Sequence, residues 1–279
     1  MGTKGNQDTG KKEIMFLAAD GTRTFLGWVA FFIEKNGNQF LSGTITTLYI
    51  SLTGTIVGFF IGLCVALVRE AYIDEKTPVI KKFFIKLSQI IIKIYIAVFR
   101  GTPMIVQAMV IYYGLPVLLQ RFDFNLDPIP AALFIVSINT GSYMAEIIRG
   151  GIDSVDKGQL EGAQAIGMSH FQTMKSIIFP QAIRNVLPSV GNEFIINIKD
   201  TSVLNVISVT ELFFTSKSLA GTYTRYYEVF IITSAIYFFL TFTISLILRF
   251  VEKKIDGPKN FEIAETIEKE IDSNLLKER

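Results

Sequence analysis

Polar side chains recur at helical spacing in two otherwise apolar stretches of the sequence. They are Asn139, Ser142, Tyr143 and Glu146 in the first stretch, and Glu193, Asn197 and Asp200 in the second, where Thr201 and Ser202 add hydroxyls beside Asp200. Offsets of three, four and seven residues place side chains on one face of a helix. If the stretches cross a membrane, such groups need polar partners or a wet cavity. The spacing therefore predicts two polar faces turned toward each other or toward a shared cavity.

A purely structural role for the carboxylates stays open on these residues. Glu146 and Glu193 could pair with Arg149 or Lys199 and hold helices together, whereas Asn139, Asn197 and Asp200 fall nearer the middle of their stretches. The central groups are the better candidates for lining a polar cavity, because uncompensated polar groups are costly at that depth.

The composition indicates that these stretches lie in a membrane. Of 279 residues, 50% are hydrophobic and 19% are charged, and the mean hydropathy is +0.41. A soluble domain usually carries about 25% charged residues. The net charge of +2 does not suggest nucleic-acid binding, one Cys excludes an intramolecular disulfide, and one His excludes a multi-histidine metal site. We expect an integral membrane protein that binds no metal.

Hydropathy predicts an all-α bundle of about five transmembrane helices. The expected spans are 43–68, 94–116, 128–148, 185–210 and 228–250, and together they form a transmembrane domain over 43–250. The fourth is the least clear, because Glu193, Lys199 and Asp200 fall within it. The first contains Gly54, Gly58 and Gly62, which favours close helix packing, either at a dimer seam or within one subunit.

Basic residues predict the orientation of the bundle. Segments 69–100 and 149–184 carry eleven Lys and Arg residues, against three in the loops 117–129 and 211–227. The first pair should therefore be cytoplasmic, with the N-terminus outside and the C-terminus inside. Within the polar segment 1–42, the apolar run 24–33 is too short to cross and is expected to be an interfacial helix. The charged tail 251–279 is expected in the cytoplasm.

The cytoplasmic segment 150–183 has the pattern of two short helices. Gly167 stands where a helix-terminating glycine is expected, and Ser169 with Gln172 forms a capping box for the second helix. Pro180 is expected to end that helix. An amphipathic connector lying on the membrane would show the same pattern.

The residues of this segment resemble the EAA loop of ABC-transporter permeases. Glu161-Gly162-Ala163, Gly167, Ile177 and Phe179-Pro180 match the spacing of that motif, with Gly162 replacing Ala and Phe179 replacing Leu. The flanking segments FRGTPMIVQAMVIYYGLP (99–116), INTGSYMAEIIRGGI (138–152) and 187–212 look like the polar amino acid permeases, which include histidine, glutamine and arginine permeases. The resemblance covers about residues 40–252.

This resemblance implies the permease subunit of an ATP-driven importer for a polar amino acid, in a bacterial-type cell membrane. Two permease subunits, alike or different, would form the pathway, and an extracytoplasmic binding protein would deliver the amino acid. Two cytoplasmic ABC ATPase subunits would dock on the loop residues Glu161, Gly162, Ala163, Gly167, Ile177 and Pro180. The chain contains no G-x-x-x-x-G-K-[ST] loop, so we expect no cofactor and no catalytic residue here, with ATP and Mg²⁺ bound by the ATPase.

Two other classes of protein compete with this interpretation. An intramembrane enzyme would need a nucleophile and base at membrane depth, yet the one histidine, His170, falls in the cytoplasmic segment. An ion-coupled secondary transporter or channel could use Glu146, Glu193 and Asp200 as ion sites. Uptake that depends on ATP and survives a protonophore separates an ATP-driven importer from this second alternative.

Overall fold

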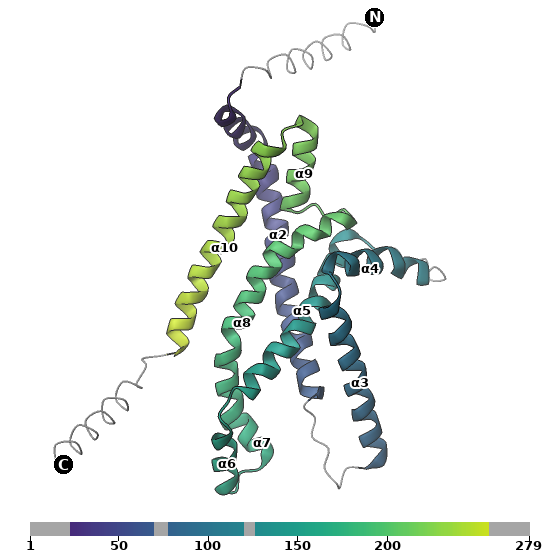
Figure 1. Ribbon diagram of the computed structural model, residues 1–279, viewed down its shortest axis with the longest axis vertical. Coiled ribbons are helices and arrows are strands. Elements are labelled where there is room, and N and C mark those ends of the chain that lie inside the picture. Colours follow the sequence, from purple (N-terminus) through teal and green to yellow (C-terminus); the bar gives the residue numbers. More distant parts are fainter. Residues whose placement is uncertain (1–22, 70–77, 120–125, 257–279) are drawn as a thin grey trace, which may run out of the picture.

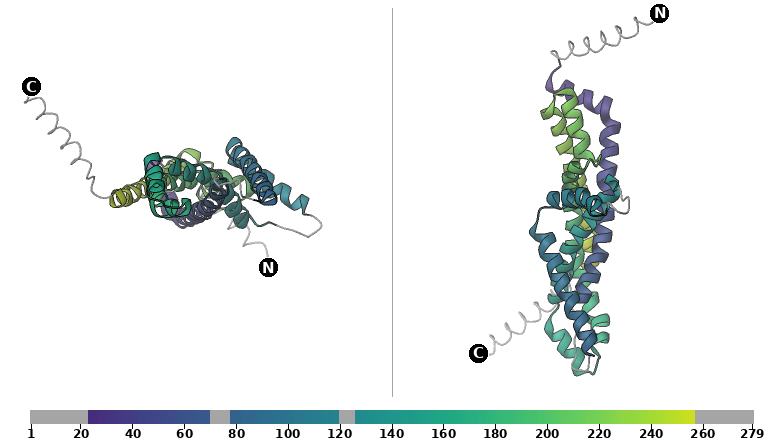
Figure 2. Two further views of the ribbon diagram at one scale, coloured as in Figure 1. Left: turned by 90° about the horizontal axis from the view of Figure 1, so that it is seen from below. Right: turned by 90° about the vertical axis from the view of Figure 1, so that its right-hand side faces the viewer.

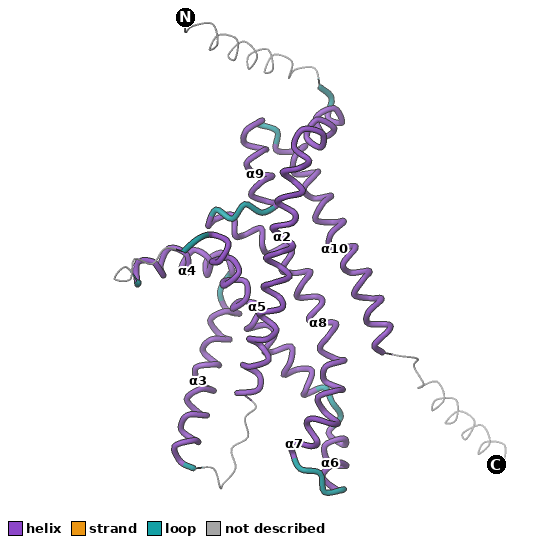
Figure 3. The backbone as a smooth tube through the Cα atoms, turned by 180° about the vertical axis from the view of Figure 1, so that it is seen from behind, coloured by secondary structure: helices purple, strands orange, loops and turns teal. Residues whose placement is uncertain are grey.

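The computed structural model describes residues 23–69, 78–119 and 126–256, and these ranges contain helices and connecting turns but no strand. Figure 1 shows an elongated bundle, with α9 and the start of α2 at one end and α6 and α7 at the other. Figure 3 shows the same all-helical architecture from behind. The predicted all-α class is confirmed.

The first long helix, α2 (Phe25–Arg69), has 45 residues and includes both the expected interfacial helix and the first span. The expected boundary at residue 42 therefore falls inside a continuous helix. At about 1.5 Å per residue, α2 is roughly twice as long as a bilayer core is thick. One face of its N-terminal half packs against protein, because Trp28 and Phe32 are fully buried in a cluster with Leu219 and Val229.

The second predicted span is not one helix. It is divided into α3 (Val79–Gly101) and α4 (Met104–Leu118), and the chain bends by 113° between the two helices. Thr102 is extended because a residue that precedes proline is disfavoured in helical geometry, and Pro103 then starts the next helix. The Gln107 side-chain amide donates to the carbonyl oxygens of Phe99 and Thr102, both at 2.9 Å, and so satisfies groups that the break exposes. Figure 2 shows the crosswise direction of α4.

The core of the bundle is the contact between α2 and α5 (Pro128–Asp153). A Cβ atom added at Gly54, Gly58 or Gly62 would overlap Val136, Thr140 or Met144 of α5. The glycine stripe therefore serves packing within one subunit, which resolves the alternative left open by the sequence.

The connector between α5 and α8 contains α6 (Lys157–Ala165) and α7 (His170–Thr173). Gly167 has φ +82°, and the Ser169–Gln172 capping box is present, as predicted. The prediction for Pro180 is wrong: α7 continues through a π turn, Met174–Ile178, directly into α8 (Phe179–Asp200). Pro180 is tolerated because it lies in the first turn of α8, where it removes no α-helical hydrogen bond. The Gln181 side chain donates to the backbone carbonyl of Ile177 at 2.9 Å.

Beyond Asp200 the chain tightens into a 3₁₀ helix, η4 (Thr201–Ile207), and then forms α9 (Leu212–Tyr223) and α10 (Tyr226–Asp256). The sequence predicted a loop over 211–227, where the structure has α9. Three helices, α2, α5 and α10, are long and apolar enough to cross a membrane, and α3 with α4 makes a fourth if the bent pair counts as one. The number five stays a prediction. Helix α10 extends past residue 250, and most of the predicted tail lies outside the described residues.

Candidate functional site

The middle of the bundle contains a buried polar junction centred on Asn197. Its side chain is 3% exposed, and its Nδ2 donates to Oγ1 of Thr55 at 2.8 Å and of Thr140 at 3.0 Å. Because the three residues lie on α8, α2 and α5, one amide joins three helices. Asn197, a predicted pathway residue, therefore also holds the helices that would form a pathway.

A second junction connects α5 to the crosswise helix α4. Asn139 Nδ2 donates to Gln107 Oε1 at 2.8 Å, and Ser142 Oγ donates to the backbone oxygen of Asn139 at 2.7 Å. Gln107 also binds the break between α3 and α4, so these side chains fix the position of α4 on the bundle.

Toward the connector, Glu146 is surrounded by three arginines. Its carboxylate accepts hydrogen bonds from Arg69 of α2 and from Arg149 one turn along α5, and Arg100 of α3 lies 3.9 Å away. The Arg100 guanidinium also lies 5.5 Å from the centre of the Tyr143 ring. Glu146 is thus engaged in an ion-pair cluster joining α2, α3 and α5, which matches the structural role that its sequence left open.

The predicted polar face of α8 does not stay together. Asn197 is buried, Glu193 is half-buried and Asp200 is exposed. At 100° per residue, offsets of four and seven place Asn197 and Asp200 about 60° apart. This angle is enough to place Asn197 in the contact with neighbouring helices and Asp200 outside that contact. Asp200 has no hydrogen-bond or ion-pair partner within 23–69, 78–119 and 126–256.

The two predicted polar sets also stay separate. Within the described ranges no hydrogen bond joins a member of the α5 set to a member of the α8 set. Thr201 is buried and donates to the Ile198 carbonyl at 2.9 Å, while Ser202 is half-buried. Five members are half-buried or exposed rather than fully buried: Glu146, which is engaged in its ion pairs, and Tyr143, Glu193, Asp200 and Ser202, which lie on α5, α8 and η4 and make no ion pair within the described ranges.

Sequence reasoning missed a buried carboxylate at the start of α9. Glu211 is fully buried and caps α9 by accepting from the backbone N–H groups of Phe213 and Phe214 at 2.9 and 2.6 Å. Tyr237 of α10 and Thr47 of α2 donate to the same carboxylate at 3.2 and 3.4 Å. A carboxylate directly before an apolar helical segment is the available signal, because an acidic N-cap stabilises a helix.

The connector residues form an exposed apolar turn. Ala163 packs inward, whereas Glu161, Gly162 and Gly167 are exposed. Ile166 and Phe171, on either side of Gly167, are 77% and 73% exposed. Ile177 is half-buried and Pro180 is exposed where the chain returns to the bundle. Large exposed apolar side chains on a short helical turn are typical of a surface that binds another protein.

A helical bundle with an exposed apolar turn is the architecture that the resemblance to transport permeases predicts. Residues 83–257 match the family of binding-protein-dependent transport system inner membrane components, and the chain belongs to this family. It is therefore a multi-pass inner membrane protein and a transport component. An ion-coupled secondary transporter or channel is not favoured.

The individual relatives are amino acid permeases. The chain is 35% identical to the probable amino-acid permease protein YxeN of Bacillus subtilis, over 76% of this chain and 89% of the relative. It is also 35% identical to the glutamine transport system permease protein GlnP of Escherichia coli K12, over 77% and 92%. A solved structure, an amino acid ABC transporter with histidines, matches with a TM-score of 0.71 and 36% identity, covering 84% of this chain and 99% of that chain.

Proposed function

We propose that this chain is the permease subunit of an ATP-binding-cassette importer for a polar amino acid. The observation that carries the proposal is the similarity to the solved amino acid ABC transporter, which extends over almost the whole of that chain. Relatives named for glutamine and arginine transport support the substrate class.

The accessible polar residues are the proposed lining of the pathway. Tyr143, Glu193, Asp200 and Ser202 are accessible and offer hydrogen-bonding groups and charge to a zwitterion. The remaining predicted residues do not line the proposed pathway but support the residues that do. Asn139, Ser142, Glu146, Asn197 and Thr201 are bonded to neighbouring helices or to their own backbone, so they hold the lining residues in place.

The α6–α7 turn is the proposed contact with a cytoplasmic ABC ATPase. Ile166 and Phe171 would enter a groove on the ATPase, and the left-handed backbone at Gly167 gives the turn between them its shape. ATP and Mg²⁺ would be bound by that ATPase. Helix α7 is continuous with α8, so a displacement of the turn would move the proposed lining residues on α8 directly.

The assembly that follows contains two such permease chains, identical or not, two ATPase subunits and an extracytoplasmic amino-acid-binding protein. The end of the bundle that contains α6, α7 and the start of α3 would face the cytoplasm (Figure 1), because the basic segments of the sequence converge there. In this orientation the N-terminus is outside and the C-terminus is cytoplasmic.

Reconstitution tests the proposal. The chain is purified with the subunits that accompany it, placed in proteoliposomes with its binding protein, and supplied with ATP. We expect uptake of a polar amino acid that requires ATP hydrolysis and persists in the presence of a protonophore. Uptake driven by an ion gradient in the absence of ATP would overturn the proposal.

A further inference from the structure

Helix α3 carries a row of basic side chains along one side. Lys82, Lys86, Lys93 and Arg100 follow one another at intervals of four, seven and seven residues, so they lie within about 40° of one another around the helix. The helix contains no Asp or Glu. Figure 1 shows α3 at the edge of the bundle, with its start at the end that contains α6 and α7. One side of this helix therefore has a concentrated positive charge.

The two lysines in the middle of the row are available to an external anion. Lys86 and Lys93 are exposed, and neither makes an ion pair within residues 23–69, 78–119 and 126–256. Arg100 differs, because it lies 3.9 Å from the Glu146 carboxylate and 5.5 Å from the centre of the Tyr143 ring. A lysine ammonium close to hydrocarbon is costly unless it meets an anion or water.

The exposed surface beside the row is apolar along most of the helix. Phe83, Ile90, Ile94 and Val98 are between 48% and 62% exposed. At 1.5 Å per residue they extend over about 23 Å, compared with roughly 30 Å for a hydrocarbon core. In an inner membrane component, a surface of this length contacts lipid chains, because a water-soluble partner cannot enter the hydrocarbon.

The two lysines lie close to the level at which α2 ends. Gln89 of α3 donates to the backbone oxygen of Arg69, the last residue of α2, at 3.0 Å. Lys86 precedes Gln89 by three residues and Lys93 follows it by four, so each is about 5–6 Å away along the axis. Helical side chains lean toward the N-terminus, which lets the Lys93 ammonium extend back to this level. Both ammonium groups can therefore meet lipid headgroups at the membrane edge.

The charge of α3 argues against a second copy of the chain on this surface. In a twofold contact the same patch of both copies meets itself. Lys86 and Lys93 would then approach the equivalent lysines of the other copy, and α3 has no acid to balance them.

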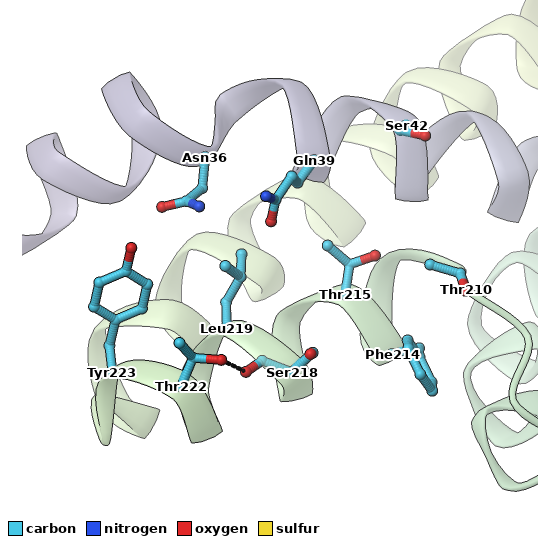
Figure 4. Close-up of a pocket in the computed structure, with 10 residues that line it drawn as sticks. All are labelled: Asn36, Gln39, Ser42, Thr210, Phe214, Thr215, Ser218, Leu219, Thr222 and Tyr223. Atoms are coloured by element: carbon cyan, nitrogen blue, oxygen red, sulfur yellow. Dashed lines mark hydrogen bonds between the residues drawn. The ribbon is translucent and has the colours of Figure 1, made fainter. Parts of the chain in front are cut away.

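The cavity at the other end of the bundle is not an alternative site for an anion. It lies between α2 and α9, and Figure 4 shows its lining, which contains amides, hydroxyls and apolar side chains but no Lys or Arg. A phosphate would lose its hydration there without gaining an opposite charge.

We propose that α3 binds an anionic phospholipid. The lipid phosphate accepts hydrogen bonds from Lys86 and Lys93, and an acyl chain lies along Ile90 and Ile94. Basic groups beside a membrane helix attract anionic lipids. A zwitterionic phospholipid binds the same surface more weakly, because its own ammonium offsets its phosphate. This inference rests on the membrane location of the family and not on the amino acid that the chain transports.

Site-directed photocrosslinking in the assembled complex tests the lipid site. p-Benzoylphenylalanine replaces Ile94 as the reporter, or Phe238 of α10 as the matched control. Phe238 is 61% exposed, and the nearest basic residue in the sequence, Arg249, is eleven residues away. The complexes are placed in vesicles of equal amounts of dioleoylphosphatidylglycerol and dioleoylphosphatidylcholine and irradiated. The crosslinked lipids are identified by mass spectrometry.

We expect phosphatidylglycerol adducts to exceed phosphatidylcholine adducts several-fold at position 94 and the two lipids to react equally at position 238. Lys86→Gln with Lys93→Gln should remove the excess, whereas Lys86→Arg with Lys93→Arg should keep it. Lys253→Gln with Lys254→Gln, which removes two exposed lysines at the end of α10, should leave the excess unchanged.

Equal amounts of the two adducts at position 94 in the parent would overturn the proposal. So would an excess that survives Lys86→Gln with Lys93→Gln, is lost in the arginine variant or in the α10 variant, or appears equally at position 238. A crosslink from position 94 to protein in place of lipid would also refute the lipid site, because another subunit would then cover this surface.

Discussion

A methyl group added at Gly62 should destabilise the subunit, although alanine is the better helix former. The added Cβ would lie 2.8 Å from the backbone nitrogen of Ala145 and from the backbone carbon of Met144. Neither atom can move away without displacing α5, so α2 and α5 must separate. The control is Gly37→Ala in the same helix, where no atom lies within 4 Å of the added Cβ.

The magnitudes follow from two opposing effects. Replacing Gly by Ala within a helix contributes about 1 kcal/mol of stability. Overpacking a well-packed contact costs about 1–3 kcal/mol, and contact with backbone places Gly62→Ala at the upper end of that range. We therefore expect Gly62→Ala to lower the free energy of unfolding by about 2 kcal/mol and Gly37→Ala to raise it by about 1 kcal/mol.

Equilibrium unfolding of the purified chain by SDS in mixed micelles measures both values against the parent. Equal stability of the two variants would refute the reasoning, because it would mean that α2 and α5 do not approach each other at Gly62. A loss of stability in Gly37→Ala as well would show that the effect comes from the helix itself and not from its packing.

Three further predictions concern the proposed site and the coupling turn. Asp200→Asn should give a normal membrane yield, because Asp200 is exposed, and should reduce uptake or change substrate preference in proteoliposomes; low yield with normal uptake per molecule would assign it a structural role. Gly167→Asp costs about 1 kcal/mol at its positive φ, and it should abolish ATPase co-purification and uptake while the chain still inserts; normal uptake would contradict the coupling assignment. Glu146→Gln should lower the free energy of SDS unfolding by about 1–3 kcal/mol, because Arg69 and Arg149 lose their anionic acceptor, and unchanged stability would show that the ion pairs contribute nothing.

Structural features that depend on residues close together in the sequence were predicted correctly. The capping box at Ser169 and the helix end at Gly167 depend on residues within one turn of each other, and both are confirmed. Pro180 and Pro103 show the limit of such signals. The same residue type lies in the first turn of a continuing helix at 180 and at a 113° break at 103. What differs is the surrounding structure, a π turn in one case and the Gln107 side chain in the other.

The sequence by itself determined the membrane environment, the all-helical class and the local shape of the α6–α7 turn, because hydropathy, helical period and capping act over short distances. The tertiary structure decided which side of each helix meets a neighbour. It placed Gly62 against α5, buried Asn197 among three helices, and left Asp200, one turn further along, exposed. Helical periodicity fixes the angle between two side chains on a helix, but the angle between the helix and its neighbours depends on the packing of the whole bundle.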